Sequence, residues 1–372
     1  MNVTDRAYAL ELDKNDPLAH FKSQFVVTDP EMCYLDGNSL GRLPKETISA
    51  VNNLMSEWGS EVVSGWGHWV DEAQPTGDLL GQAALGAGPG QILVCDTTSV
   101  NFYQLCLAAV HARPGRKTII TDAANFPTDR YILDGIAKQF GLKLVLIENE
   151  DPAVAIHERI TTQVLAPYLN DDVALVTLQV IQYRSGARTD IKSITDQVRA
   201  IGALVVWDAS HAVGAIELNL DANGVDLCVG CTYKYCNSGP GSPAWLYVSH
   251  AMQNELQVPI QGWFAQRDQF AMGQGFDRVE GMRGFQIASP SIIGMRCVQT
   301  SLSMIERAGL EEIAKKAAIG TNLMIELHDA WLAPLGFSVV TPRDSRRRGG
   351  HISVRHEHAY KVSEAMRVFG NV

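Results

Sequence analysis

Between residues 90 and 250 the chain alternates short apolar runs with longer amphipathic stretches. The apolar runs are rich in Val, Ile and Leu, which is typical of strands buried on both faces of a sheet. They lie at 91–95, 117–120, 143–147, 173–178 and 203–207. Strands that alternate with helical segments predict a mostly parallel sheet covered by helices. In such sheets functional groups collect beyond the carboxyl ends of the strands.

The two flanks of this region have a different pattern. Helical spacing occurs at 44–60, 290–308 and 299–330, and strand-like runs occur at 337–340 and 351–354. These elements predict a smaller α+β domain built from both chain ends. The predicted divisions are an N-terminal segment at 1–60, a large domain at 61–295 and a C-terminal part of the small domain at 296–372.

Composition and charge narrow the possible functions. The 372 residues are 46% hydrophobic and 19% charged, which is ordinary for a globular protein. The net charge of −10 disfavours nucleic acid as a partner. The one basic run, Arg346-Arg347-Arg348, lies among Pro, Asp, Ser and Gly residues, and we predict a solvated loop there.

The chain shows no sign of export or of membrane insertion. The first twenty residues carry several charges and lack the apolar stretch of a signal peptide, and no apolar window is long enough to span a bilayer. We therefore expect a cytoplasmic protein without a membrane partner. The seven cysteines are an odd number, so reduced thiols are expected. We find no Cys and His set that would supply four convergent ligands, and we predict no metal site.

The strongest chemical signal is a carboxylate paired with a lysine. Asp208 directly follows the strand at 203–207, and Lys234 comes 26 positions later, before the Gly/Pro turn at 237–241. A pyridoxal 5′-phosphate (PLP) enzyme needs such a pair, because the lysine forms the Schiff base and the aspartate keeps the ring nitrogen protonated. Singly, the aspartate would indicate a helix cap and the lysine a surface group. The pair at this spacing favours the cofactor.

Two further segments suit other parts of the same cofactor. Thr98 and Ser99 stand between the strand at 91–95 and a helix predicted to begin near Phe102, where N–H groups and hydroxyls bind phosphate. A hydroxyl-rich helix cap without a ligand is the alternative. Phe126 is predicted to lie on the cofactor ring, and Asp129 is predicted at the ring hydroxyl.

Several segments together resemble one family. They are Thr232-Tyr233-Lys234-Tyr235-Cys236-Asn237, Asp208 with His211-Ala212-Val213-Gly214, Phe126-Pro127-Thr128-Asp129, Leu35-Asp36-Gly37-Asn38-Ser39-Leu40-Gly41, Gly262-Trp263-Phe264 and Arg348-Gly349-Gly350-His351. This set is similar to the kynureninases, PLP-dependent hydrolases of fold type I. The resemblance runs from about residue 30 to the end of the chain. Many fold-type-I enzymes share the aspartate and the lysine, whereas the Tyr-Lys-Tyr-x-Asn and Gly-Trp-Phe pieces belong to this family.

The resemblance implies a fold, a reaction and an assembly. The implied fold is α/β, with a mostly parallel sheet of the seven-stranded type flanked by helices and a smaller α+β domain. The implied reaction is hydrolysis of L-kynurenine or 3-hydroxy-L-kynurenine to L-alanine and anthranilate or 3-hydroxyanthranilate, in tryptophan catabolism and NAD precursor synthesis. The implied assembly is a homodimer in which Trp263 and Ser289 complete the neighbouring active site.

The resemblance also implies roles for individual residues. Lys234 is the Schiff-base lysine and proton shuttle, Asp208 the pyridinium partner and Phe126 the stacking residue. The phosphate end is implied for Thr98, Ser99, His211, Tyr233 and Trp263. Tyr233 also protonates the carbanion left on the alanine fragment. Substrate contacts are implied for Ser39, for Ser289 near the aryl ketone, and for Trp66 or His68 as an aromatic wall.

This chain departs from the family pattern at three places. Gln266 replaces a histidine after Gly-Trp-Phe, and Gln179 replaces a small hydroxyl residue near the cofactor. The chain also stops at Val372, where the family continues with an arginine that clamps the substrate carboxylate. We expect that this arginine is missing and that the chain is truncated.

Two other functions remain open. One is another fold-type-I PLP enzyme, either a class V aminotransferase or a cysteine desulfurase. A desulfurase needs a cysteine on a mobile loop, and Cys297 lies on a predicted helix. The other is a protein that binds PLP without catalysis.

Overall fold

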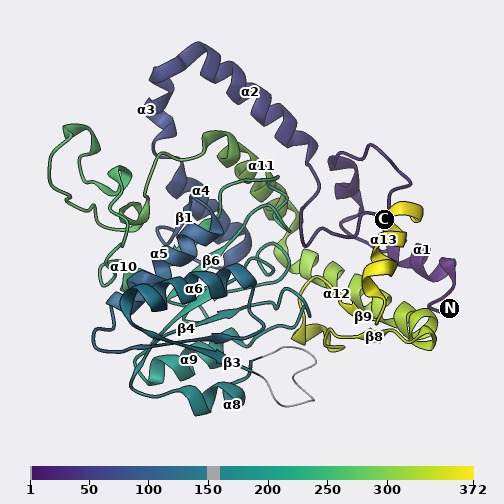
Figure 1. Ribbon diagram of the computed structural model, residues 1–372. Helices are drawn as coiled ribbons and strands as arrows, with labels where there is room; N and C mark the ends of the chain where they lie inside the picture. Colours follow the sequence, from purple (N-terminus) through teal and green to yellow (C-terminus); the bar gives the residue numbers. More distant parts are fainter. Residues whose placement is uncertain (1, 149–159) are drawn as a thin grey trace.

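The computed structural model describes residues 2–148 and 160–372, and its centre is a seven-stranded sheet (Figure 1). The strand order is β1-β7-β6-β5-β4-β2-β3. The strands are β1 (Ile92–Val94), β2 (Thr118–Asp122), β3 (Lys143–Ile147), β4 (Val173–Gln179), β5 (Leu204–Asp208), β6 (Leu227–Gly230) and β7 (Trp245–Val248). The five predicted strands are confirmed, and β6 and β7 are additional.

The sheet is mixed but mostly parallel. Strands β2 to β6 pair in parallel, and β7 runs antiparallel to both of its neighbours, β1 and β6. In the central strands nearly every residue is buried, because helices cover both faces. The carboxyl ends of β4, β5 and β6 therefore open at one edge, with Gln179 in register with Asp208 and Asp208 in register with Val229.

Among the described residues, five helices lie around the sheet. They are α4 (Ala73–Leu80), α5 (Thr98–His111), α6 (Pro127–Phe140), α9 (Ile191–Ala200) and α11 (Ile292–Ala308). Helix α5 is apolar on most sides because it lies across the sheet from β4 to β7. Helix α9 starts at Asp190, whose carboxylate accepts the N–H of Ser193.

Helix α2 (Lys45–Glu61) packs along α11, as Figure 1 shows. The helix predicted at 290–308 is confirmed as α11. The helical spacing at 299–330 belongs to two helices, because Gly309 separates α11 from α12 (Leu310–Leu327) with a left-handed φ of 78°. No described helix is long and apolar enough to cross a bilayer.

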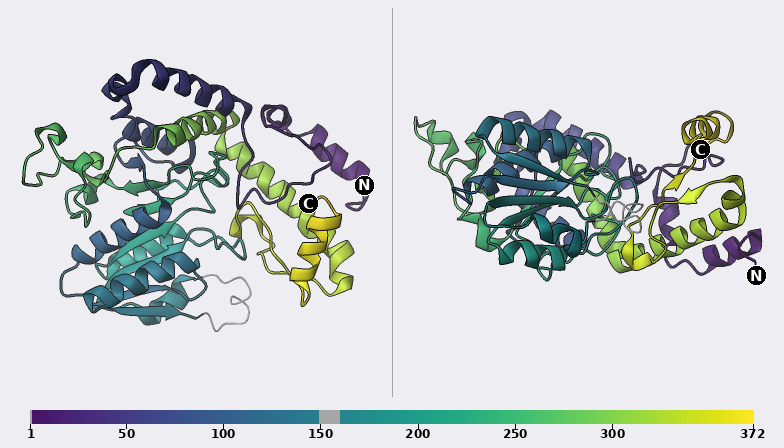
Figure 2. Two further views of the ribbon diagram at one scale, coloured as in Figure 1. Left: turned by 45° about the horizontal axis from the view of Figure 1, so that its top comes forward. Right: turned by 60° about the horizontal axis from the view of Figure 1, so that its bottom comes forward.

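The two ends of the chain lie side by side (Figure 2). Helix α1 (Arg6–Lys14) leads into a segment in which Asp16 forms an ion pair with Lys316, and Cys33 donates its N–H to the carbonyl of Asn371. The predicted terminal strands form a short antiparallel pair, β8 (Ser338–Val339) and β9 (Val354–Arg355), followed by α13 (Ala359–Phe369). The domain boundaries at 60 and 295 stay predictions.

The remaining elements are short. They are η1 (Ala19–Gln24), η2 (Val62–Gly65), α3 (Trp66–Trp69), η3 (Gly81–Leu85), α8 (Thr162–Leu165), η4 (Ala166–Tyr168), α10 (His250–Gln253), η5 (Trp263–Ala265), η6 (Gln269–Ala271), η7 (Met282–Phe285), η8 (His328–Leu332), η9 (Ala333–Leu335) and η10 (Ser345–Arg347).

The prediction of a solvated loop at Arg346-Arg347-Arg348 is wrong for Arg348. Arg346 is exposed, but Arg348 is only 2% exposed, because its backbone forms a bridge with Ala187 that turns its side chain inward. Its five N–H groups donate to the carbonyls of Ala318, Pro342 and Arg343 and to the side chains of Thr321 and Asn322. Burial lowers the pKa of this guanidinium below its ordinary value.

We expect Arg348→Met to lower the free energy of unfolding by about 2–4 kcal/mol, because it leaves several buried acceptors without a donor. Arg346→Met is the matched control, since its side chain is 87% exposed, and it should change stability by less than about 0.5 kcal/mol. Urea unfolding followed by tryptophan fluorescence measures both. Equal stability of the two variants would contradict the structural role of Arg348.

Candidate active site

Lys234 and His211 meet at the open edge of the sheet. Lys234 follows β6 and His211 follows β5, and these adjacent parallel strands bring their next residues together. The distance from Lys234 Nζ to His211 Nε2 is 2.7 Å. Burial, together with the charge of Lys234, lowers the pKa of His211 to about 2. His211 is therefore neutral and accepts a hydrogen bond from the lysine.

Two carboxyl groups lie together beside this pair. Asp208 is the last residue of β5 and is 5% exposed, and Asp129 in the first turn of α6 is 4% exposed. Burial and the neighbouring Asp208 raise the pKa of Asp129 well above its ordinary value. Asp129 Oδ2 has no hydrogen-bond partner among the described residues. Asp129 thus lies against the predicted ring-nitrogen partner, and its charged form is disfavoured there.

Phe126 presents an aromatic ring to the lysine. The ring is 38% exposed, and its centroid lies 5.9 Å from Lys234 Nζ. The ring of Tyr183 packs edge-on against it, with centroids 5.2 Å apart. Sequence reasoning missed Tyr183, although its place four residues beyond the end of β4 is a strand-end position that the topology rule covers.

Helix α5 begins at Thr98, four residues before the predicted start near Phe102. The cap is Thr97, whose hydroxyl accepts the N–H of Val100. Thr98 and Ser99 are therefore in the first turn, and their hydroxyls form no hydrogen bond within the described residues. The first turn thus has two hydroxyls and unpaired N–H groups available for an anion.

Tyr233 joins the lysine loop to the segment that carries Ser39. Burial, Cys231 and Asp208 raise the pKa of Tyr233 to about 12, so its hydroxyl keeps a proton at neutral pH. Its carbonyl accepts the N–H of Gly41 at 2.8 Å. A Cβ at Gly41 would lie 2.4 Å from the carbonyl oxygen of Lys234, so only glycine fits there. Ser39, two residues earlier, is exposed.

Comparison with known proteins agrees with this geometry. The aminotransferase class-V family model matches residues 33–368. A kynureninase of Burkholderia pseudomallei is 34% identical over 97% of this chain and 86% of its own length. A kynureninase of Pseudomonas fluorescens is 32% identical over 98% of this chain and 86% of its own length. The chain belongs to the kynureninase family. Its class V relatives are PLP-dependent enzymes.

Solved structures show the same fold at lower identity. A cysteine desulfurase from Thermococcus onnurineus superposes with a TM-score of 0.77 at 19% identity, covering 96% of this chain and 85% of its own. A C-DES mutant with glycine covalently linked to its PLP cofactor has a TM-score of 0.77 at 16% identity, covering 91% and 88%. The predicted fold type I is thereby confirmed.

The residues present fit the cofactor of the kynureninase family. The buried carboxyls of Asp129 and Asp208 suit a cationic ring N–H, since two such groups cannot both be ionised without one. The orphan Oδ2 of Asp129 and the orphan Nδ1 of His211 are polar atoms that a ligand can satisfy. Lys234 stands between these groups and the Phe126 ring.

Trp263 and Ser289, which the resemblance led us to expect at a neighbouring site, lie apart from this cluster. Trp263 in η5 is 45% exposed and packs against Phe264 and Phe270, and Ser289 is exposed. Within the described residues neither Trp263 nor Ser289 contacts Lys234. Gln266, which replaces the family histidine, accepts the N–H of Asp277.

Gln179 is the other departure from the kynureninase pattern, and it supports the turn that follows β4. Its side chain is buried at the end of β4, in register with Asp208. Its Oε1 accepts the N–H of Tyr183 at 3.2 Å. The amide thus holds the turn that carries the Tyr183 ring.

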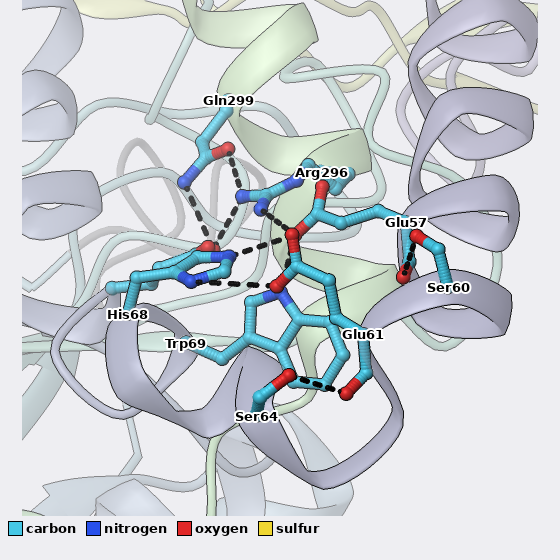
Figure 3. Close-up of polar contacts among 9 residues, drawn as sticks. Glu57, Ser60, Glu61, Ser64, His68, Trp69, Arg296 and Gln299 are labelled. Carbon is cyan, nitrogen blue, oxygen red and sulfur yellow. Dashed lines mark hydrogen bonds and ion pairs between the residues drawn. The ribbon is translucent and has the colours of Figure 1, made fainter.

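His68 and Trp66 have different surroundings, and these favour Trp66 as the aromatic wall. His68 Nε2 lies 2.8 Å from Glu57 Oε1, and Glu61 lies on its other side (Figure 3). The buried Trp69 donates its Nε1–H to the same Glu57 oxygen. Glu57, Glu61 and His68 offer atoms within 4.8 Å of one another, but Arg296 near Glu57 offsets the negative charge, and we assign no ion there.

Trp66 is free of this network and lines an apolar groove of about 540 Å³. The groove lies between α2 and residues 290–293, directly after Ser289. Two predicted substrate residues, Trp66 and Ser289, are thus brought near one groove, while the Lys234 cluster lies elsewhere.

The buried His211 and the half-buried His351 make the fold sensitive to acid. The pKa of His211 is about 2 and that of His351 about 4, mainly because of burial, against an ordinary value of 6.5. Below pH 6.5 these histidines are protonated in the unfolded chain but stay neutral in the folded chain. The free energy of unfolding therefore falls as the pH falls. The loss is about 1.4 kcal/mol per pH unit for each histidine.

We expect urea midpoints of the cofactor-free protein to fall progressively from pH 7 to pH 4.5, and to fall less steeply in His351→Asn, which removes one of the two groups. If the urea midpoints of the wild type and of the variant fell equally steeply with pH, His351 would not be held neutral in the folded protein.

Proposed function

We propose that this protein hydrolyses L-kynurenine, 3-hydroxy-L-kynurenine or both to L-alanine and the corresponding anthranilate, with PLP held at Lys234. The observation that carries the proposal is the convergence of Lys234, His211, Asp208 and Phe126 at one sheet edge, in a chain 34% identical to a kynureninase over 97% of its length. The bound cofactor supplies an electron sink for the bond that breaks.

Lys234 carries the first proton transfers. Its amine must lose a proton before it can act as a nucleophile, and the neutral His211 Nε2 at 2.7 Å is placed to accept the lysine's hydrogen bond. With the cofactor bound, the Lys234 amine would be the base that takes the proton from the substrate α-carbon. Asp208 would pair with the protonated ring nitrogen of the cofactor, and the raised pKa of Asp129 beside it disfavours a second negative charge there.

Tyr233 is suited to the last proton transfer. A hydroxyl whose pKa is raised to about 12 keeps its proton at neutral pH and can give it to the β-carbon of the alanine fragment. Thr98 and Ser99 in the first turn of α5 bind the phosphate end, and Phe126 orients the ring.

We also propose a homodimer whose active sites are shared. The support is the apolar groove between α2 and 290–293, where Trp58, Val62 and Val63 are more than half exposed. Trp263 and Ser289, which have no recorded contact with Lys234 in one described chain, would contribute to the partner's site. Mixing inactive Lys234→Ala with Trp263→Ala protein should restore part of the activity if sites are shared.

The place of the reaction in the cell is a further part of the proposal. We place it in tryptophan breakdown or pyridine nucleotide synthesis, and the seven cysteines, none of which is paired with another, support only the cytoplasmic location.

A cysteine desulfurase activity is disfavoured by one observation. Cys297 lies within α11, where its thiol donates to the carbonyl of Ile293 and burial raises its pKa. A helical thiol of raised pKa is a poor mobile nucleophile.

Incubation with kynurenine, with anthranilate fluorescence as the readout, distinguishes the proposed hydrolase from an aminotransferase and from a protein that binds PLP without turnover.

We expect Lys234→Ala to abolish turnover, because only an amine there can link the cofactor and move the α-proton. Borohydride reduction followed by peptide mass spectrometry should find the cofactor on the Lys234 peptide of the wild type and on no peptide of the variant. Lys138→Ala is the control, since that side chain is 76% exposed, and it should react like the wild type. A reducible adduct in Lys234→Ala would show that another lysine binds the cofactor.

We expect Asp208→Asn to bind the cofactor but to lower kcat by about 10³-fold or more, because the amide keeps the shape and removes the charge that acts in the transition state. Asp196→Asn, at a half-exposed position on α9, is the control. Steady-state kinetics with kynurenine measures both. Near-normal turnover in Asp208→Asn would exclude this role.

A further inference from the structure

The segment after Arg348 reaches the active site through close backbone packing. Gly349 donates its N–H to the carbonyl of Gly186 at 2.8 Å. A Cβ at Gly349 would lie 2.8 Å from Ile181, and one at Gly350 would lie 3.2 Å from the ring of Tyr235. Any larger residue would push this segment away from the large domain. The chain therefore delivers His351 to a fixed position.

His351 is bound first to the lysine loop. Its Nδ1 lies 3.2 Å from the hydroxyl of Tyr235, the residue after Lys234. Burial and Asp36 raise the pKa of Tyr235 above its ordinary value, so the hydroxyl keeps its proton and donates it to Nδ1. The neutral imidazole then carries its own hydrogen on Nε2.

The other edge of the imidazole faces the turn after β4. A Cβ at Gly186 would lie 3.3 Å from Nε2 of His351, and the backbone of Tyr183 interacts with the same ring. Tyr183 in turn packs its ring against Phe126. One histidine thus connects the lysine loop with the turn that supports the stacking ring.

The face of the imidazole lies near the histidine that touches the lysine. The ring centroids of His351 and His211 are 5.6 Å apart, and His211 Nε2 accepts a hydrogen bond from Lys234 Nζ. The charge of Lys234 lowers the pKa of both histidines, which places both imidazoles within electrostatic reach of the amine. Sequence reasoning recorded His351 only as part of a motif and gave it no role.

We propose that His351 is a positioning residue of the cofactor site, which holds Tyr235 of the lysine loop and the Tyr183 turn behind Phe126 in a single arrangement. The inference rests on the proposed binding of PLP at Lys234. Docking of residues 348–351 then sets how tightly the cofactor ring is held.

The experiment compares PLP affinity in His351→Leu, His351→Asn and Tyr235→Phe. His351→Leu removes the acceptor Nδ1, whereas the oxygen of His351→Asn can still accept from Tyr235. We expect His351→Leu and Tyr235→Phe each to raise the Kd for PLP about 5- to 20-fold, and His351→Asn to recover most of that loss. The double variant Tyr235→Phe/His351→Leu should bind no worse than His351→Leu alone, because both remove one contact.

His356→Leu is the matched control. This histidine lies five residues further on in the same domain, stacked on Phe337. It should lower the thermal midpoint without changing the Kd for PLP. The affinity for PLP should recover in His351→Asn even though its thermal midpoint is no higher than that of His351→Leu. Such a result separates a positioning role from an effect on general stability.

A second measurement uses the protein without cofactor. Imidazole ¹⁵N NMR of the cofactor-free wild type should show His351 with its hydrogen on Nε2, and Tyr235→Phe should shift its Nδ1 signal. Wild-type protein that takes up no PLP would overturn the proposed function and this inference with it. Wild-type protein that binds PLP, with His351→Leu binding equally well, would overturn the inference alone.

Discussion

The buried carboxyl groups of Asp129 and Asp208 lie next to each other, and this constrains the rest of the site. Burial and the neighbouring Asp208 raise the pKa of Asp129 well above its ordinary value, so a second buried negative charge beside Asp208 is disfavoured. The edge of the sheet supplies the other requirements around this pair: an amine on Lys234, a neutral acceptor on His211 and an aromatic face on Phe126. Two buried carboxyl groups, with the Lys234 amine beside them, favour a flat cationic ring over a neutral ligand.

Part of this could be predicted because it depends on strand ends. Asp208 ends the predicted strand β5, so a rule about where parallel strands end was enough to mark it, and Lys234 was found by its spacing from Asp208. The same rule did not find β6 and β7 themselves. Each is four residues long, β6 contains a cysteine and a glycine, and β7 follows a turn rich in Gly and Pro, so neither has the long aliphatic run that marks a buried strand.

What could not be predicted depends on contacts between distant segments. Arg346 and Arg348 are equivalent in the sequence, but a bridge to Ala187, more than 150 residues away, makes one a surface group and the other a buried donor to five acceptors. Tyr183 and His351 reach the site in the same way, through a turn and a loop whose partners lie far along the chain. No local pattern encodes such partners, because periodicity reports only which face of an element is covered.

The joining of the two chain ends has a consequence for biosynthesis. The segment that supports the lysine loop through Gly41 is made early by the ribosome, and its partners Lys316 and Asn371 are made late. During translation the sheet and Lys234 therefore emerge before the helices that hold the N-terminal segment in place. In the nascent chain Asp16 and Cys33 therefore have to wait for Lys316 and Asn371 to be made before these two contacts between the chain ends can form.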